Sequence, residues 1–187
     1  MNVIIFGPPG AGKGTQSQHI VKKFKLFQVS TGDLLRNEIK NKSEIGKEIE
    51  EIISKGDFAT DDIVNNLIKN VISDPQKKNR LIFDGYPRSL SQAKNLDFLL
   101  DSSNQKIDFI FFLNVNKDMI IKRIEKRKIL EKRADDDSNT ILKRYDAYME
   151  TTRPVLDFYS KNPNFYEIDG SEEISVISSK IEQILSV

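Results

Sequence analysis

The stretch VIIFGPPGAGKGT, residues 3–15, joins a short apolar run to a loop with four glycines and a lysine. The apolar residues 3–6 are followed directly by glycine and proline, which predicts a buried strand of a parallel sheet. A glycine-rich loop between a strand and a helix can turn successive backbone N–H groups toward one anion, and Lys13 can reach the outer oxygens of a phosphate chain. A structural turn alone does not need this combination, so the stretch predicts a nucleotide phosphate-binding loop.

Position 14 departs from the usual pattern of such loops. The pattern G-x-x-x-x-G-K-[ST] has a hydroxyl residue directly after the lysine, whereas this chain has Gly14 there and carries the hydroxyl on Thr15. Thr15 can approach the phosphates or a hydrated magnesium ion from the first helical turn, or can serve only its own helix. The sequence leaves these alternatives open.

Apolar runs alternate with helical patterns along the rest of the chain. Strands are predicted at 3–6, 27–30, 81–84, 107–115 and 165–169, and helices from about Lys13 and at 31–41, 44–55, 61–73, 89–100, 117–127, 138–160 and 173–185. This alternation predicts an α/β fold, with a parallel sheet between two helical layers and ligands beyond the carboxyl ends of the strands. Small inserts explain the extra helices between the second and third strands better than a second domain does.

The composition excludes several classes of protein. The chain has 187 residues and a net charge of +1, which favours a single domain without an overall field that would recruit nucleic acid or an anionic membrane. The absence of cysteine excludes disulfides, thiol catalysis and thiolate zinc sites. No apolar run approaches the roughly 20 residues of a membrane span. We therefore expect a cytoplasmic protein with neither nucleic acid nor membrane as a partner.

Two acidic residues are candidates for holding magnesium. Asp33 lies in STGD at a predicted helix start, and Asp84 ends the predicted strand 81–84. Because magnesium keeps several of its waters in proteins, we expect both carboxylates to bind it through water. Each carboxylate could instead cap a helix or a turn, and this alternative stays open, in particular for Asp33.

A second anion site is predicted by STGDLLR, residues 30–36, and DGYPRSLSQ, residues 84–92. The first stretch follows a strand and opens a helix, which repeats the helix-start geometry that favours an anion. In the second stretch Arg88 follows a turn, and Gln92 lies one helical turn farther on. An arginine suits a phosphate, and a carboxamide can pair with the adjacent donor and acceptor of adenine.

The chain resembles the adenylate kinases over essentially its whole length. GPPGAGKGTQ, STGDLLR, GDFATDDIV, DGYPRSLSQ and RADDDSNTILKR occur in the order and spacing of that family, in which Gly-Lys-Gly-Thr is the normal loop. The resemblance implies a P-loop nucleotide kinase with a five-stranded parallel sheet that converts MgATP and AMP reversibly to two ADP. It also implies a monomer whose single domain, 1–187, divides into a core (1–29, 60–126 and 134–187), an AMP-binding flap (30–59) and a short lid (127–133).

Site residues follow from the resemblance, position by position. It assigns ATP binding to Gly10, Ala11, Gly12, Lys13, Gly14, Thr15, Arg123, Arg127 and the backbone at Glu172. It assigns AMP binding to Thr31, Arg36, Asp57, Phe58, Ala59, Gly85, Tyr86, Pro87, Arg88, Gln92, Arg133 and Arg144. The catalytic charges are expected on Lys13, Arg88, Arg123, Arg127, Arg133 and Arg144. Arg80 and Arg153 match no motif and are expected to be solvated or structural.

The predicted lid departs from the family pattern. Only KILEK, residues 128–132, separates Arg127 from Arg133, which leaves no room for a zinc-bearing lid domain. Short lids of this family usually contain glycines and this one has none, so we expect it to be stiffer or more helical, or to rest its apolar tip, Ile129 and Leu130, on another surface. We hypothesise that the lid opens more slowly or less completely.

Three other functions compete with this interpretation. A pyrimidine nucleoside monophosphate kinase shares the loop, flap and lid, but Thr31 and Gln92 favour adenylate as the acceptor. A switch GTPase is suggested by NKSE, residues 41–44, which lies too early in the chain for guanine recognition. A binding module without catalysis would not need Lys13, Asp84 and arginines from separate segments.

Overall fold

Parallel strands form one five-stranded sheet in the computed structural model of the chain, which describes residues 1–54, 59–131 and 138–186. The strands are β1 (Val3–Phe6), β2 (Phe27–Ser30), β3 (Leu81–Asp84), β4 (Phe109–Asn114) and β5 (Phe165–Asp169), in the spatial order β2-β3-β1-β4-β5. All predicted strands are confirmed. β4 is shorter than predicted at both ends, since it begins at Phe109 and ends at Asn114.

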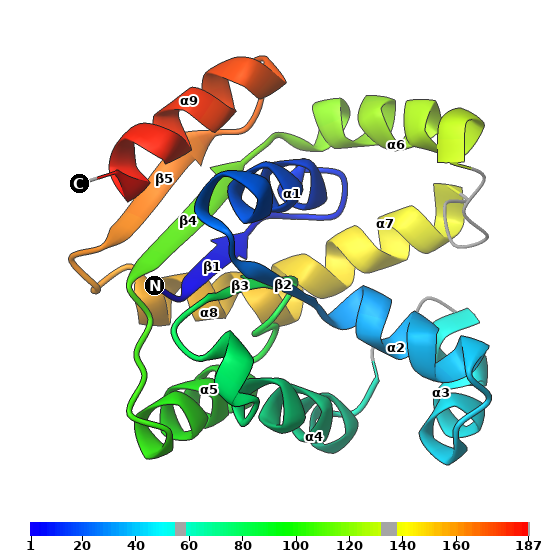
Figure 1. Cartoon of the computed structure of the whole chain (residues 1–187). Coiled ribbons are helices and arrows are strands. Elements are labelled where there is room, and N and C mark those ends of the chain that lie inside the picture. Colours follow the sequence, from blue (N-terminus) through cyan, green and yellow to red (C-terminus); the bar gives the residue numbers. More distant parts are fainter. Residues whose placement is uncertain (55–58, 132–137, 187) are drawn as a thin grey trace.

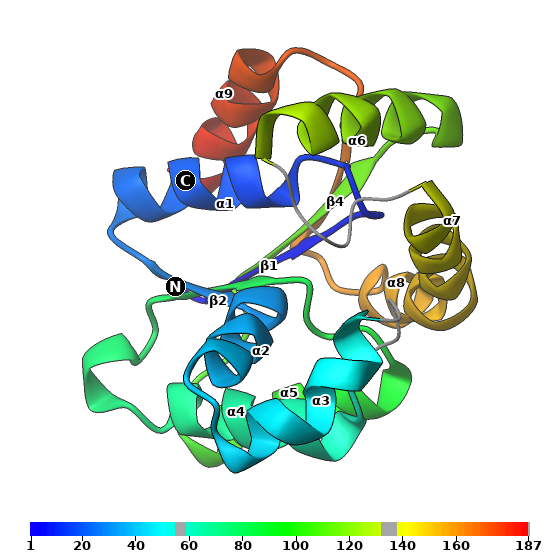
Figure 2. The same ribbon diagram turned by 90° about the vertical axis from the view of Figure 1, so that its right-hand side faces the viewer.

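Helices cover both faces of this sheet (Figures 1 and 2). One layer contains α1 (Lys13–Phe24), α6 (Lys117–Glu131) and α9 (Ile174–Leu185); the other contains α4 (Asp61–Ile72), α5 (Leu90–Ser102) and α8 (Arg153–Tyr159). The remaining helical segments are α2 (Thr31–Lys40), α3 (Glu44–Ser54), the short 3₁₀ turn η1 (Pro75–Lys77), α7 (Ser138–Ala147) and the π-helical turn η2 (Tyr148–Thr152). None of the helices within the described ranges is long and apolar enough to cross a membrane.

Alternation along β1 explains the two layers. Ile4 and Phe6 pack into the core beside α4, α5 and α8, whereas Val3 and Ile5 pack into the core beside α1 and α9. Successive side chains of a strand point to opposite faces, and all four are at most 3% exposed. Burying such side chains contributes about 1.5–3 kcal/mol each, so the run that precedes the loop also anchors the centre of the sheet.

Two helices differ most from their predicted bounds. α6 continues to Glu131 instead of ending at residue 127, so the backbone of 128–131 is helical, as the glycine-free sequence led us to hypothesise. The single helix predicted at 138–160 is wrong: α7, η2 and α8 divide it. Pro154 explains this division, because proline lacks the N–H that a continuous helix needs and is tolerated only in the first turn, where it lies in α8.

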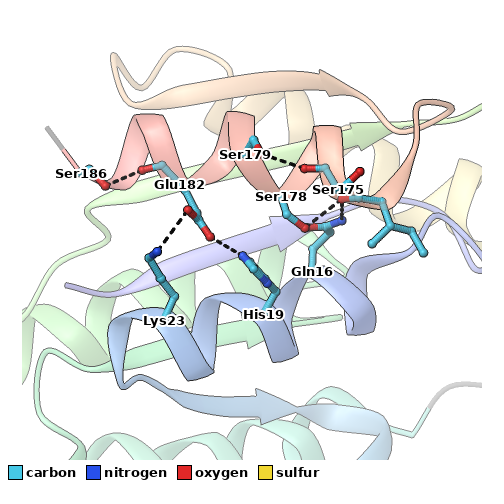
Figure 3. Close-up of polar contacts among 9 residues, drawn as sticks. Gln16, His19, Lys23, Ser175, Ser178, Ser179, Glu182 and Ser186 are labelled. Carbon is cyan, nitrogen blue, oxygen red and sulfur yellow. Dashed lines mark hydrogen bonds and ion pairs between the residues drawn. The ribbon is translucent and has the colours of Figure 1, made fainter.

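Side chains of α1 and α9 form a polar seam between these helices (Figure 3). The Gln16 amide donates to the carbonyl of Ile174 at 3.1 Å and accepts from the Ser178 hydroxyl at 2.8 Å. One turn farther on, His19 Nε2 lies 2.5 Å from Glu182 Oε1, and this hydrogen bond lowers the pKa of Glu182. The seam fixes the start of α1, and with it the loop, against α9.

Candidate functional site

The loop between β1 and α1 curls around the ammonium group of Lys13. Lys13 Nζ donates to the carbonyls of Gly7 at 2.7 Å and Pro8 at 3.1 Å. Gly12 precedes the helix with φ at 95°, a left-handed conformation that favours glycine. The N–H groups of the first turn of α1 therefore face the loop interior, where an anion would lie at the positive end of the helix.

Asp84, at the end of β3, faces the same loop. Its Oδ2 accepts from Gln28 Nε2 at 3.0 Å, and a Cβ added at Gly14 would lie 3.7 Å from it. Burial raises the pKa of Asp84, and the charge of Lys13 opposes this shift. The absence of a side chain at position 14 thus leaves the carboxylate open toward the loop. A desolvated carboxylate beside a phosphate site is suited to a cation or its water shell.

Arginines reach the loop and its surroundings from α6, from α7 and from the segment before α5. Arg123 of α6 donates from Nη1 to the carbonyl of Ala11 at 3.3 Å. Arg88 donates from Nε to the carbonyl of Gly85 at 2.8 Å, and burial, followed by the charge of Arg144 in α7, lowers the pKa of Arg88 to about 10. The folded chain thus brings two guanidinium groups close enough to repel each other, which an anion between them would relieve.

A cavity of about 130 Å³ lies beside Arg88. We call it the Thr31 cavity; it is lined by Thr31, Leu35, Ala59, Asp61, Val64, Gly85, Arg88, Ser89, Gln92 and Thr151. Thr31 Oγ1 donates to the carbonyl of Gly85 at 3.0 Å, and Gly85 has φ at 76°. A Cβ there would lie only 3.1 Å from Arg88 Nη2, so glycine permits the close approach of the arginine.

Gln92, at the wall of this cavity, is held on both sides of its amide group. Its Oε1 accepts from the backbone N–H of Arg88 at 2.8 Å, and its Nε2 donates to Asp61 Oδ1 at 2.6 Å. Thr152 of η2 donates to the carbonyl of Arg88 at 3.1 Å. The segment 88–92 is therefore tied to α4 and to η2.

The structure separates other predicted residues from this cavity. Tyr86 is fully buried with its hydroxyl 2.8 Å from Asn65 Oδ1, and neither Tyr86 nor Pro87 lines the cavity. Arg36 is exposed and pairs with Asp33 at 2.5 Å, so the Asp33 carboxylate lies at the surface of α2. Glu172 precedes α9 and pairs with Lys180 at 2.6 Å.

Several predicted positions are not covered by the description. Asp57, Phe58 and Arg133 lie outside the described residues. Arg127 is described only through its backbone, within α6. Arg80, predicted to be solvated or structural, donates to the carbonyl of Lys25 from Nε at 3.1 Å and from Nη2 at 2.6 Å, which confirms a structural role.

A larger cavity, of about 680 Å³, lies at the opposite edge of the sheet. Met1, Asn79, Gln105 and Asp108 are among its lining residues, near the amino ends of β1 and β4. Ligands of parallel α/β sheets bind outside the carboxyl ends of the strands, where the order of the strands reverses. The Thr31 cavity and the loop after β1 lie at that edge, so they form the candidate site in spite of the smaller volume.

Sequence reasoning missed Asp61, Thr152 and Gln28 as parts of this site. An acidic residue at a helix start has an ordinary explanation in the helix dipole, and threonine or glutamine in a helix or strand carries no motif. Their contacts with Gln92, Arg88 and Asp84 join segments 31, 64 and 56 residues apart. Only the tertiary structure brings these pairs together.

Comparisons with known proteins agree with this geometry. A family model described as adenylate kinase matches residues 5–164. The adenylate kinase of Pelagibacter ubique (strain HTCC1062) is 48% identical over an alignment of 213 residues that covers 100% of each chain. That of Caulobacter sp. (strain K31) is 38% identical over 187 residues, 100% of this chain and 99% of its own, and that of Thermosipho africanus (strain TCF52B) is 33% identical over 100% of this chain and 99% of its own. With a glycine-rich loop around Lys13, a half-buried arginine beside it and matches over its full length, the chain belongs to the adenylate kinase family.

Proposed function

We propose that the chain transfers the terminal phosphoryl group of MgATP to AMP and so forms two ADP reversibly. The observation that carries this proposal is the pairing of two anion sites at one sheet edge: the loop around Lys13, and Arg88 beside the Thr31 cavity. The name shared by its relatives supports the same reaction. The cavity is smaller than the roughly 300–1,000 Å³ typical of whole-ligand sites, which suits the base of the acceptor nucleotide.

The division of labour follows from the charges. Gly10–Thr15 and Arg123 hold the phosphates of ATP, and Arg88 and Arg144 hold the phosphate of AMP. Phosphoryl transfer proceeds through a state with charge spread over the equatorial oxygens, so positioning and charge neutralisation dominate catalysis. No general base is required, because a phosphate monoester with a second pKa near 6 is largely ionised at neutral pH.

The acceptor base is tested by comparing AMP, CMP and UMP with MgATP in a coupled assay of ADP formation. Hydrogen-bonding sites discriminate strongly against partners that leave their polar groups unpaired. We expect kcat/KM for AMP to exceed that for either pyrimidine nucleotide by roughly 10²-fold or more. A preference for CMP or UMP would instead identify a pyrimidine nucleotide kinase.

Adenylate kinases use Mg²⁺ with ATP, and we propose that Asp84 holds this ion through water. Asp84 fits this role because it is a desolvated carboxylate that faces Gly14. When bound, Mg²⁺ supplies charge neutralisation at the phosphates. Asp33 is the weaker candidate because it is exposed and paired with Arg36.

Substitution of these two acids separates their roles. We expect Asp84→Asn to weaken the apparent affinity for Mg²⁺ about tenfold when ATP is present, as the loss of an outer-sphere partner does in other metal sites. Asp33→Asn is the matched variant and should change this affinity much less. Calorimetric Mg²⁺ titrations at constant ATP measure both, and a larger effect from Asp33→Asn would reverse the assignment.

We further propose that residues 30–59 form the flap over AMP and residues 127–133 the lid over ATP, in a monomer that acts in the cytoplasm. Closure of both segments would exclude water and so limit hydrolysis of ATP. The pairing of α2 with α3 as a unit at the end of β2 supports the flap. The continuation of α6 to Glu131 supports a lid built as a helix extension rather than a separate domain.

A further inference from the structure

Asp61, the first residue of α4, is the centre of a hydrogen-bond cluster at the wall of the Thr31 cavity. Its Oδ1 accepts from Gln92 Nε2 at 2.6 Å. Its Oδ2 accepts from the hydroxyl of Ser89 at 3.0 Å and from that of Ser91. One carboxylate thus gathers three side-chain donors from the start of α5.

The two partners of the Gln92 amide determine which way it faces. A carboxylate only accepts hydrogen bonds and a backbone N–H only donates them. With Asp61 on one side and the N–H of Arg88 on the other, the nitrogen must face Asp61 and the oxygen must face Arg88. Because a carboxamide has two N–H donors and two acceptor positions on its oxygen, one of each is left for a ligand.

This remaining pair distinguishes two purines. Adenine presents an amino donor next to the ring acceptor N1, which match the free oxygen position and the free N–H of Gln92. Hypoxanthine presents a carbonyl acceptor next to an N1–H donor, which is the reversed order. An amide held in a fixed orientation would accept the first base and leave the second with two opposed donor or acceptor contacts.

We propose that Asp61 is a positioning residue that fixes the Gln92 amide and thereby selects adenine over 6-oxopurines as the acceptor base. The inference rests on the proposed function, in which Gln92 contacts the base of AMP. Gln92 is 5% exposed. If Asp61 were removed, water could therefore not easily replace the hydrogen bond that the Gln92 amide group would lose. The carboxylate therefore contributes order as well as a hydrogen bond.

A competing explanation is that Asp61 only places negative charge at the start of α4, where the helix dipole favours it. Asp62 provides the comparison, because it follows in the same first turn and is exposed. The two explanations require different properties of residue 61. The helix dipole requires a negative charge, whereas Gln92 requires a hydrogen-bond acceptor. Asparagine removes the charge and keeps an acceptor oxygen.

The experiment measures kcat/KM for AMP and for IMP with MgATP in the full-length protein. We expect Asp61→Ala to lower the ratio of AMP to IMP by about tenfold or more, within the range for a good bidentate base contact, chiefly through KM for AMP. Asp61→Asn should restore most of the ratio. Asp62→Ala, the matched control, should leave it unchanged. Thermal unfolding of each variant confirms that the compared proteins are folded.

A double-mutant cycle tests whether Asp61 acts through Gln92. In a Gln92→Ala background, Asp61→Ala should have no further effect on the ratio, because coupled residues do not add. Equal losses in Asp61→Ala and Asp61→Asn, a wild-type ratio in Asp61→Ala, or full additivity with Gln92→Ala would each overturn the inference. In those cases AMP phosphorylation by the wild type still supports the proposed function, whereas absent AMP phosphorylation would overturn both.

Discussion

Replacement of Lys13 by alanine is expected to lower the turnover number by roughly 10²–10³-fold, the cost of removing one preorganised charge or donor from a transition state, while the Kd for AMP stays within about twofold. The ammonium lies within the loop, 2.7 Å from the carbonyl of Gly7, and in the proposed function it would contact the outer phosphates of the donor. The Thr31 cavity does not include it. Initial rates at saturating MgATP and AMP, with AMP binding measured by calorimetry, separate these two quantities.

Controls for Lys13 must account for its contacts within the loop. Its loss removes hydrogen bonds to two loop carbonyls, so Lys13→Gln, which keeps donors without the charge, serves as the second variant. Lys22→Ala removes an exposed lysine of the same helix and should leave turnover unchanged. Wild-type turnover in Lys13→Ala, or a parallel loss of AMP affinity, would contradict the catalytic role.

Replacement of Arg88 by methionine is expected to lower kcat/KM for AMP by roughly 10³-fold while the ligand-free protein unfolds at the same temperature or higher. The loss follows because charged hydrogen bonds to a desolvated phosphate are among the strongest polar contacts, and their removal leaves a buried anion unpaired. The stability follows from the cost of keeping a partly desolvated, half-buried cation close to Arg144. Calorimetric unfolding and a coupled assay measure the two effects.

The effect of Arg88 on stability follows from the direction of its pKa shift. Folding lowers the pKa of Arg88 to about 10, below its value in the unfolded chain, so the folded state holds this proton less tightly. The charged form therefore carries a cost in stability at every pH below about 10, and this cost disappears only as the pH rises toward the higher pKa of the unfolded chain. A neutral side chain of similar length avoids this cost throughout the neutral range.

The effect of AMP on thermal unfolding provides a second test of Arg88. A ligand that binds only the folded state raises the unfolding temperature, and we expect this rise in the wild type and its loss in Arg88→Met. Arg153→Met is the control, because Arg153 is exposed at the start of α8 and matches no motif of the site. A marked fall in the unfolding temperature of ligand-free Arg88→Met would show that its contacts, including the 2.8 Å bond to Gly85, outweigh its desolvation.

The sheet and the loop were predictable because their signals are local. Four consecutive apolar residues before a glycine-rich turn give a buried strand, and the same residues turn out to face both cores. Pro154 is also a local signal for a helix boundary, but the helical pattern on both sides of it led us to predict one helix across it. The polar side chains that support the site are different. Asp61 faces Gln92 because α4 packs beside α5, and no spacing along the chain encodes that contact.

The polar seam between α1 and α9 also has a consequence for the order in which the chain is synthesised and packed. Gln16 and His19 are joined to partners 158 and 163 residues later in the chain. At synthesis rates of about 5–20 residues per second, roughly 10–30 s pass between the synthesis of α1 and the synthesis of these partners. During that interval the loop after β1 is already synthesised, but α1 is not yet covered by α9. The start of α1 is thus fixed against α9 only after residues 174–182 have been synthesised.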